Sequence, residues 1–342
     1  MKKKYLINSF YFQKLLFEKY LSNYFDFDFY PKKFEKPERA LTYVPSNLIN
    51  LKKMYWLKII NKYDVIHFNR PEAFYCYKKL PNQLSVFEAH GFDIGVLAES
   101  YLKDIVSPWK KYVGKFVDMF LKKKIIEHIK QVDLWYCSTP DLVRPLSEWC
   151  GRTPEWLPNP IDIDFFSPDI PKKKLEGSPA CFLAARLHGD KKPEIAIDIF
   201  KKYIKPQFKD ATLHLIATGE LVKKYQSELT DPNTYFWHPY MTKEQLREKL
   251  RGADLVFGDF SIGALSMLPL QVMALKKPVI TLDKYEVIKK SIEELPEFAL
   301  KILEDTKFRN GWVERCFKHV HEVHGPQAIA ERHLANLRRI RN

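Results

Sequence analysis

"ACFLAARLHGDKKPEIAIDIF", residues 180 to 200, decides the fold, because it has the pattern of a strand, a short turn and a helix in succession. The apolar run ends at Arg186, and Lys191 and Lys192 stand at the mouth of an amphipathic helix. A helix N-terminus carries partial positive charge, so two lysines there are unfavourable unless an anion is shared between them. The stretch therefore predicts a parallel α/β unit with an anion site after its strand.

The same alternation of strand and helix patterns recurs along the whole chain. Short apolar, β-branched or aromatic runs alternate with longer stretches of helical spacing, a pattern typical of parallel sheets covered on both faces. The runs predicted as strands are "KYLINSF" (4–10), "DVIHF" (64–68), "QLSVFEAH" (83–90), "VDLWYCS" (132–138), "ACFLAAR" (180–186), "ATLHLIAT" (211–218), "NTYFWH" (233–238), "ADLVFG" (253–258) and "KPVITL" (277–282). We therefore expect two Rossmann-like domains that face a central cleft.

A proline-rich segment separates the two halves of this pattern. It runs from residue 157 to residue 180 and ends in a lysine run followed by Gly-Ser-Pro. The tail from Pro326 has helical spacing that would let it pack back across the domains. We expect an N-terminal Rossmann-like domain over residues 1–165, a linker over 166–179, a C-terminal Rossmann-like domain over 180–325, and a helix over 326–342 that packs on the N-terminal domain.

Composition excludes several classes of protein. The 342 residues are 46% apolar and 14% aromatic, so the chain can bury large cores and is not disordered. Its five cysteines are scattered without a CxxC pair, which favours a reducing compartment and argues against a zinc ribbon. The basic start lacks a cleavage site and no apolar run approaches about 18 residues, so we expect neither a signal peptide nor a membrane span. A cytoplasmic protein is expected.

Histidines follow two of the predicted strands. His67 lies in "DVIHF", and His90 and Gly91 follow the run that begins at Gln83. Ligands of doubly wound folds bind at the carboxyl ends of strands, and a glycine allows close approach of the backbone. A lone histidine is more often structural than catalytic, but the place of His90 makes it a candidate for catalysis.

Further stretches form an ordered series along the chain. They are "VDLWYCSTPDLVRPLSEW" (132–149), "TPEWLPNPIDIDFFSP" (153–168), "HLIATGE" (214–220), "TYFWHPYMTKEQLREKLRGADLVF" (234–257) and "PLQVMALKKPVIT" (269–281). Together with residues 185–200, they resemble the motifs of the retaining GT-B glycosyltransferases of family 4, in the same order. Arg186 and Lys191 have the five-residue spacing of the arginine and lysine in that family's motif.

The resemblance implies a GT-B fold and transfer of a sugar from a nucleotide diphosphate-sugar to an acceptor. It implies retention of anomeric configuration. We expect UDP rather than GDP in the donor, and a glycan or lipid-linked acceptor. Arg186 and Lys191 would hold the donor diphosphate and stabilise the charge of the leaving nucleotide, with His90 near the donor sugar. Neither a metal nor a cofactor is expected, because these cations and helix N–H groups would neutralise the charge.

Two positions depart from the family's pattern. The family carries two glutamates eight positions apart, which here correspond to Gly263 and Gln271, and its glycine-rich loop after the first strand is replaced by Asn8, Ser9 and Phe10. Gln271 can still bond a ribose hydroxyl. For the sugar we expect backbone groups of residues 264–267, or Asp259 or Ser261. The expected donor-binding residues are Gly91, Gly219, Gly263, Ala264, Leu265, Ser266, Met267 and Gln271.

Three weaker patterns have simple structural explanations. "FDFDFY" (25–30) contains a DxD, but its strict alternation is that of a strand with one buried face. "HVHEVH" (319–324) gathers histidines, yet His321 would not share a helix face with both others, and no carboxylate at zinc spacing accompanies them. Residues 107–130 interleave Trp109, Tyr112, Phe116 and Phe120 with lysines, which suits either an anionic membrane surface or a core-facing stripe with a solvated face.

Two other functions stay open. The missing glutamates suit a catalytically impaired relative that binds nucleotide-sugar or glycan. The net charge of +14 also suits a nucleic-acid binder, but the chain lacks an aromatic RNA-binding motif and a helix-turn-helix signature, so we expect no nucleic-acid partner.

Overall fold

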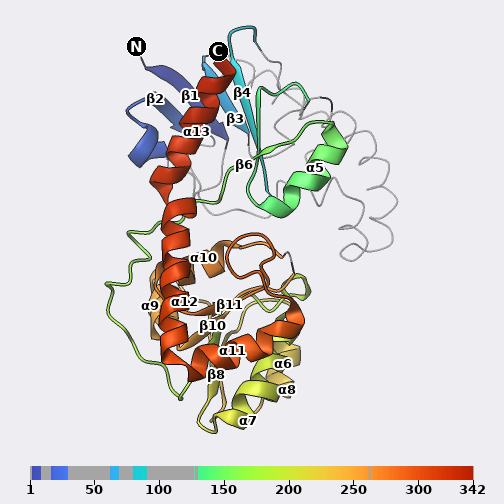
Figure 1. Ribbon diagram of the computed structural model, residues 1–342, viewed down its shortest axis with the longest axis vertical. Helices are drawn as coiled ribbons and strands as arrows, with labels where there is room; N and C mark the ends of the chain where they lie inside the picture. The colour runs from blue at the N-terminus through green and yellow to red at the C-terminus, as the bar shows by residue number, and fades with distance from the viewer. Residues whose placement is uncertain are drawn as a thin grey trace. The chain divides into compact units, whose positions relative to one another are not determined.

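The chain forms two compact units, seen in a computed structural model that describes residues 2–8, 17–29, 62–68, 80–90, 127, 130–261 and 263–341 (Figure 1). The N-terminal unit comprises Met1–Pro160 and Ile329–Asn342, and the C-terminal unit comprises Ile161–Ala328. Each unit has its own sheet.

The N-terminal unit is built on a parallel sheet. Among the described residues the sheet has six strands in the order β2-β1-β3-β4-β5-β6. The strands are β1 (Lys3–Asn8), β2 (Phe25–Phe29), β3 (Val65–Phe68), β4 (Leu84–Ala89), β5 (Leu134–Cys137) and β6 (Glu155–Trp156). Its helical segments are η1 (Phe17–Leu21), η3 (Pro140–Leu142), α5 (Val143–Cys150) and the C-terminal helix α13 (Pro326–Arg341).

The C-terminal helix completes the core of the N-terminal unit. From Ile329 onward α13 belongs to that unit, and it buries Ile329, Ala330 and Leu337 against Tyr5 and Tyr136 of the sheet (Figure 1). The apolar residues recur at helical spacing, so one stripe of α13 faces the strands. The N-terminal core therefore joins the first strand of the chain to its last helix.

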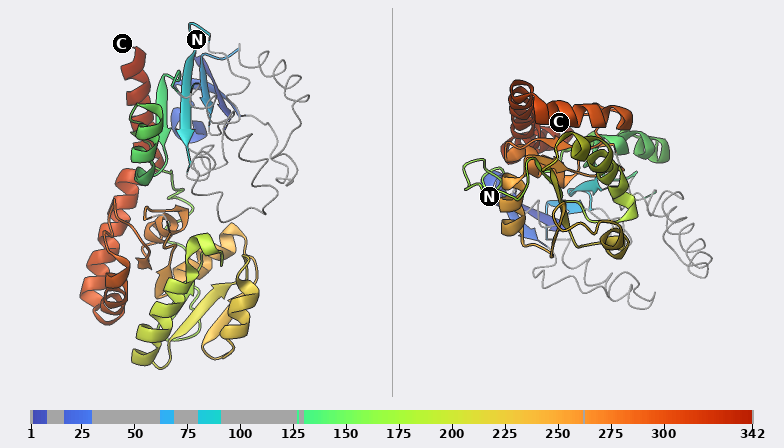
Figure 2. Two further views of the ribbon diagram at one scale, coloured as in Figure 1. Left: turned by 90° about the vertical axis from the view of Figure 1, so that its right-hand side faces the viewer. Right: turned by 90° about the horizontal axis from the view of Figure 1, so that it is seen from below.

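The C-terminal unit is a five-stranded parallel sheet in the order β11-β10-β7-β8-β9 with helices on both faces (Figure 2). The strands are β7 (Ala180–Leu183), β8 (Thr212–Ile216), β9 (Tyr235–His238), β10 (Leu255–Phe257) and β11 (Val279–Ile280). The helical segments are η4 (Gly189–Lys191), α6 (Pro193–Ile199), η5 (Phe200–Ile204), α7 (Lys205–Gln207), α8 (Val222–Glu228), α9 (Lys243–Gly252), α10 (Met267–Ala274), η6 (Ile292–Glu294), α11 (Leu295–Glu304), α12 (Thr306–His319) and η7 (Val320–His324).

The strand predictions are confirmed, since every run predicted as a strand contains one. "FDFDFY" also forms a strand, β2, with Phe25 buried and Asp26 exposed. The aromatic residues of the stretch 107–130 lie outside the described residues. Within the described part of the chain, no helix has the length and apolar character that crossing a membrane requires.

Candidate functional site

The strand order of the C-terminal sheet places a crevice after β7 and β10. From β7 the chain proceeds outward through β8 to β9, and it then returns to β10 on the other side of β7. The connections that leave β7 and β10 therefore run in opposite directions, and this opens a crevice at the carboxyl ends of those strands. Residues 184–192 follow β7, and residues 258–266 follow β10.

Arg186 and Lys191 both lie in the connection after β7. Arg186 is exposed, and its side chain makes no hydrogen bond or ion pair with any described residue, so its guanidinium is open to a ligand. Lys191 lies in the 3-10 turn η4. The expectation that the helix starts at the lysines is wrong by two residues: Lys192 has a positive φ of 49°, and α6 begins at Pro193, whose fixed φ suits a first helical position.

The connection after β7 is tied to the one after β8. Leu187 donates its N–H to the Thr218 carbonyl (2.8 Å) and accepts from the N–H of Leu221 (3.0 Å). Gly219 lies between these two bonds with a φ of 122°, and a Cβ there would lie 2.2 Å from the Leu187 carbonyl oxygen. Glu220 adds a bond, because its Oε1 accepts from the N–H of Gly189 (3.2 Å). These contacts with the connection after β8 therefore fix the backbone that carries Arg186 and Lys191.

Lys191 meets the connection after β10 at Asp259. Its Nζ lies 3.8 Å from Asp259 Oδ2, and its carbonyl accepts from the N–H of Phe260 (3.2 Å). Asp259 is buried, and the same Oδ2 accepts a short hydrogen bond from Ser266 Oγ. Its other oxygen, Oδ1, is buried and has no hydrogen-bond partner among the described residues. The crevice therefore holds a lysine, a carboxylate with a free oxygen, and a hydroxyl.

Helix α10 begins at the same crevice. Ser266 is its N-cap, but the hydroxyl bonds Asp259, so no side chain caps the helix. The first N–H groups of α10 therefore remain available to a ligand at the positive end of the helix dipole. Ala264 and Leu265 bury their side chains and can offer a ligand only backbone groups. Met267, the first residue of the helix, is half-buried.

The positions of the missing glutamates have different environments. Gly263 has a φ of 75°, a backbone that a glutamate would adopt only with strain. Gln271 lies one turn into α10 and is half-buried, and its side-chain amide makes no hydrogen bond with the described residues. The replacement of glutamate at Gly263 therefore accompanies a turn that requires glycine.

His90 of the N-terminal unit stands beside a buried carboxylate. It follows β4, and its Nε2 lies 3.5 Å from Glu88 Oε1. The other oxygen of Glu88 lies 3.2 Å from His67 Nε2, an ion-pair distance without hydrogen-bond geometry. Burial lowers the pKa of His90, and Glu88 opposes this shift. His90 is therefore mainly neutral near pH 7 and can both donate and accept a hydrogen bond.

A network of buried hydrogen bonds connects His67 to α13. Tyr5 Oη is hydrogen-bonded to His67 Nδ1 (3.1 Å) and to His333 Nε2 (3.0 Å), and His333 Nδ1 is bonded to Tyr136 Oη (2.9 Å). All these side chains are buried. Burial lowers the pKa of His333 well below its usual value, and His67 adds to the effect. The network thus holds a neutral His333 inside the N-terminal core.

A second buried carboxylate gathers two of the C-terminal histidines. Glu286 Oε2 accepts hydrogen bonds from His319 Nε2 (3.0 Å) and His324 Nε2 (2.7 Å), while His321 instead packs on Phe317. The sequence has no carboxylate at zinc spacing beside these histidines, and the fold brings one from a distance, since Glu286 comes from the connection after β11. Burial raises the pKa of Glu286, but the two histidine bonds outweigh it and lower the pKa to about 2. The atoms are of the kind that bind zinc and lie within 4.8 Å of one another, yet each already has its partner within the trio.

The structure brings together some of the expected site residues. Lys191, Gly263 and Ser266 lie at one crevice of the C-terminal unit, whereas His90 belongs to the N-terminal unit and Gly91 lies outside the described residues. Sequence reasoning missed Glu88. Its signal was a charged residue inside an apolar strand, which is rare unless the charge is paired.

The fold was compared with known proteins. No family model and no curated protein matches the chain. Among solved structures, sucrose-phosphate synthase from Thermosynechococcus elongatus is similar with a TM-score of 0.71 at 14% identity, over 99% of each chain. HepE from Anabaena, solved with UDP and glucose, gives 0.64 at 12% identity over 99% of this chain and 100% of that one. A glycosyltransferase from Rickettsia africae gives 0.61 at 13% identity over 100% and 99%. The chain has the GT-B fold, as its sequence motifs predicted.

Proposed function

We propose that this protein is a glycosyltransferase that moves a sugar from a nucleotide diphosphate-sugar to a glycan or lipid-linked acceptor, with retention of anomeric configuration. One observation carries the proposal: Arg186, whose side chain has no partner among the described residues, lies in the same connection as Lys191, and Lys191 meets the connection that leads to the uncapped start of α10. These three features are complementary to a diphosphate. The motif order and the fold likeness support the same activity.

Each cationic group has a distinct task in this proposal. The planar fork of Arg186 binds two diphosphate oxygens at once, whereas Lys191 is a point charge held beside Asp259. The N–H groups of α10 add donors of fixed direction. As the bond to the sugar breaks, negative charge grows on the leaving diphosphate and these groups stabilise it. The transfer needs no divalent ion, so a chelator leaves the rate unchanged.

Asp259 supplies the carboxylate that Gly263 lacks. Its Oδ2 lies 3.8 Å from Lys191 Nζ, and its buried Oδ1 has no hydrogen-bond partner among the described residues. Glycosyl transfer passes through a transition state with positive charge on the sugar ring, which a nearby carboxylate stabilises. Backbone groups of residues 264–267 hold the sugar hydroxyls, and Gln271 bonds a ribose hydroxyl of the nucleotide. His90, neutral and oriented by Glu88, contacts the transferring sugar.

UDP is the nucleotide that we assign to the donor. HepE, which shares the fold, was solved with UDP, and this supports the choice. We place the protein in the cytoplasm, with contact to a membrane surface where the acceptor is lipid-linked. The excess of positive charge suits an anionic surface of that kind.

A calorimetric titration with UDP tests the donor site. Wild-type protein should bind UDP, and Arg186→Ala should weaken binding by about 10- to 100-fold, because charge-assisted hydrogen bonds are lost. The matched control is Arg338→Ala, which removes an exposed arginine from the N-terminal unit. Equal UDP affinity in Arg186→Ala and the wild type would end the assignment.

A catalytically impaired relative that binds the donor is the second candidate. The glycine and glutamine at positions 263 and 271 favour it, since both family carboxylates are absent. Release of free sugar from UDP-sugars without an acceptor separates the two functions. Turnover that disappears in Lys191→Ala supports the enzyme, and binding without turnover in any acceptor mixture supports the binder.

A further inference from the structure

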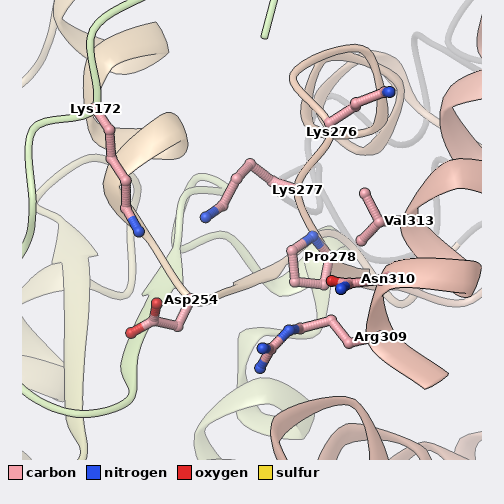
Figure 3. A pocket seen from close by; sticks show the side chains of 8 residues that line it. All are labelled: Lys172, Asp254, Lys276, Lys277, Pro278, Arg309, Asn310 and Val313. Atoms are coloured by element: carbon pink, nitrogen blue, oxygen red, sulfur yellow. The ribbon is translucent and has the colours of Figure 1, made fainter. Parts of the chain in front are cut away.

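A second basic pocket lies at the opposite edge of the C-terminal sheet. It has a volume of about 230 Å³ and is lined by Lys172, Asp254, Lys276, Lys277, Pro278, Arg309, Asn310 and Val313 (Figure 3). Asp254 directly precedes β10 and Pro278 directly precedes β11, so the pocket opens at the amino ends of the strands. Arg186 and Lys191 follow the carboxyl end of β7, so this pocket is separate from the proposed donor site.

Lys277 is the central group of this pocket. It is only 8% exposed, and it makes no ion pair or hydrogen bond through its ammonium with any described residue. Its side chain points toward Asp254 and Lys172 in Figure 3. Burial lowers the pKa of Lys277 to about 8; Lys172, Arg251 and Arg309 add to this shift, and Asp254 opposes it. Because Lys277 is more than nine-tenths buried and its ammonium has no bonded anion among the described residues, an anion bound in the pocket would stabilise it.

The rest of the lining lacks a sufficient counter-charge. Asp254 is the only carboxylate among the lining residues, and its Oδ2 already accepts from the backbone N–H of Ala180 (2.9 Å). Lys172 is exposed, and its side chain has no partner among the described residues. Arg309 donates one hydrogen bond, from Nη2 to Thr306 Oγ1 (3.1 Å). Lys276 differs, because it pairs with Glu314 (2.8 Å) and points away from the others (Figure 3).

We propose that this pocket binds a phosphomonoester, with Lys277, Lys172 and Arg309 as its ligands. A phosphomonoester carries close to two negative charges and three acceptor oxygens, which matches two ammonium groups and one guanidinium fork. The lining residues include no aromatic ring on which a base could stack, so a phosphate on a small body fits better than a nucleotide. The phosphate group belongs either to a soluble metabolite or to a lipid headgroup.

Binding is tested on the full chain carrying Arg186→Ala and Lys191→Ala, so that the proposed donor site contributes no phosphate binding. Titration calorimetry with glycerol 3-phosphate should show one site. Lys277→Met in that background should weaken binding by about 10- to 100-fold, because charge-assisted bonds are lost. Two control substitutions should change the affinity for glycerol 3-phosphate by less than about twofold. They are Lys307→Met, at an exposed position on the same helix as Arg309, and Lys173→Met, next to Lys172.

Two further measurements complete the test. Lys277→Met removes an unpaired buried charge, so its unfolding midpoint should be unchanged or raised, and a loss of binding is then not a loss of fold. If the protein sediments with vesicles that contain phosphatidic acid and Lys277→Met does not, the phosphate group comes from a lipid. If the protein binds glycerol 3-phosphate but not the vesicles, the phosphate group comes from a soluble metabolite. Absence of binding to both, or equal binding by Lys277→Met, overturns the proposal whether or not UDP binds at the other edge.

Discussion

Lys191 and Asp259 form an ion pair across the boundary between β7 and β10, and a donor diphosphate would have to share that lysine with the carboxylate. The two roles of Asp259 then oppose each other. Its negative charge repels the diphosphate in the ground state, and it stabilises the positive sugar ring in the transition state.

Asp259→Asn should therefore separate binding from turnover. The amide keeps the shape of the side chain and can still accept from Ser266, but it removes the charge beside Lys191. We expect UDP to bind up to about fivefold more tightly, from ~1 kcal/mol of lost repulsion, and turnover to fall by about 100-fold. Calorimetry with UDP and initial rates of UDP-sugar consumption measure the two effects. Asp210→Asn, at an exposed turn, should change neither.

Gln271 gives a second prediction for a single residue. If its amide bonds the ribose, Gln271→Ala should weaken UDP binding by the value of one or two neutral hydrogen bonds, about 0.5–3 kcal/mol. Gln271→Glu should be tolerated, because a carboxylate accepts from the same hydroxyls. Calorimetric titrations with UDP would show this, and the exposed Gln226→Ala on α8 is the control. An unchanged affinity in Gln271→Ala would remove Gln271 from the site.

Gly219, in the connection after β8, supports a prediction about the position of the segment that follows β7. In Gly219→Ala the new Cβ would overlap the Leu187 carbonyl, and the φ of 122° is unfavourable for alanine. The segment that carries Arg186 must then shift. We expect a loss of at least about 2 kcal/mol in unfolding free energy and weaker UDP binding, measured by urea unfolding and calorimetry.

Gly311→Ala is the matched control for that substitution. Gly311 lies within α12, and no atom beyond its chain neighbours and the adjacent helix backbone lies within 4 Å of where its Cβ would stand. Alanine is the better helix former, so this variant should gain about 0.5–1 kcal/mol and keep the UDP affinity of the wild type. Loss of stability in both variants would show that the clash at Leu187 is not the cause.

Elements of this fold were predictable from local pattern, and their ends were less so. Buried strands such as β8 and β10 consist of short apolar runs between polar segments, and that signal is contained within a few residues. The start of α6 was misplaced because the left-handed conformation of Lys192 depends on its turn and not on residue type. The π-helical turn η7, which directs His319 and His324 to Glu286, likewise has no local sequence signal.

Candidate site residues could be named from the sequence only where a motif marked them. Arg186 and Lys191 were predicted from a spacing that recurs in a family, and that prediction stays a proposal. The contacts of Asp259 with Lys191 and Ser266 appeared only in the structure. The Lys277 pocket gave no sequence signal. Its members come from segments more than a hundred residues apart, and lysines are normally exposed.

At the scale of the whole molecule, buried neutral histidines make stability depend on pH. His333 has its pKa well below the usual value through burial, and burial, Lys249 and His214 lower that of His238 to about 4. The unfolded chain takes up these protons near pH 6.5, before the folded chain does. The contribution of these histidines to the free energy of unfolding is therefore complete above pH 6.5. It is lost as the pH falls toward their pKa values in the folded protein.

Glu286 acts in a lower pH range. Its folded pKa of about 2 lies below the unfolded value, so its contribution is present above about pH 4.5 and is lost below that. Urea unfolding should therefore show a stability at pH 5.0 lower than at pH 7.5 by at least about 1 kcal/mol, caused by the histidines alone. His238→Phe should reduce the difference. Equal or higher stability at pH 5.0 would contradict the neutral state of His333.

The packing of α13 on the first strand has a consequence for how the protein is made. Tyr5 is translated 328 residues before its hydrogen-bond partner His333. At about 5–20 residues per second, synthesis of the C-terminal unit takes roughly 10–30 s, and through that time the nascent N-terminal sheet lacks the helix that covers Tyr5 and Tyr136. The C-terminal unit can fold first, and the N-terminal sheet, although it is translated earlier, matures after it.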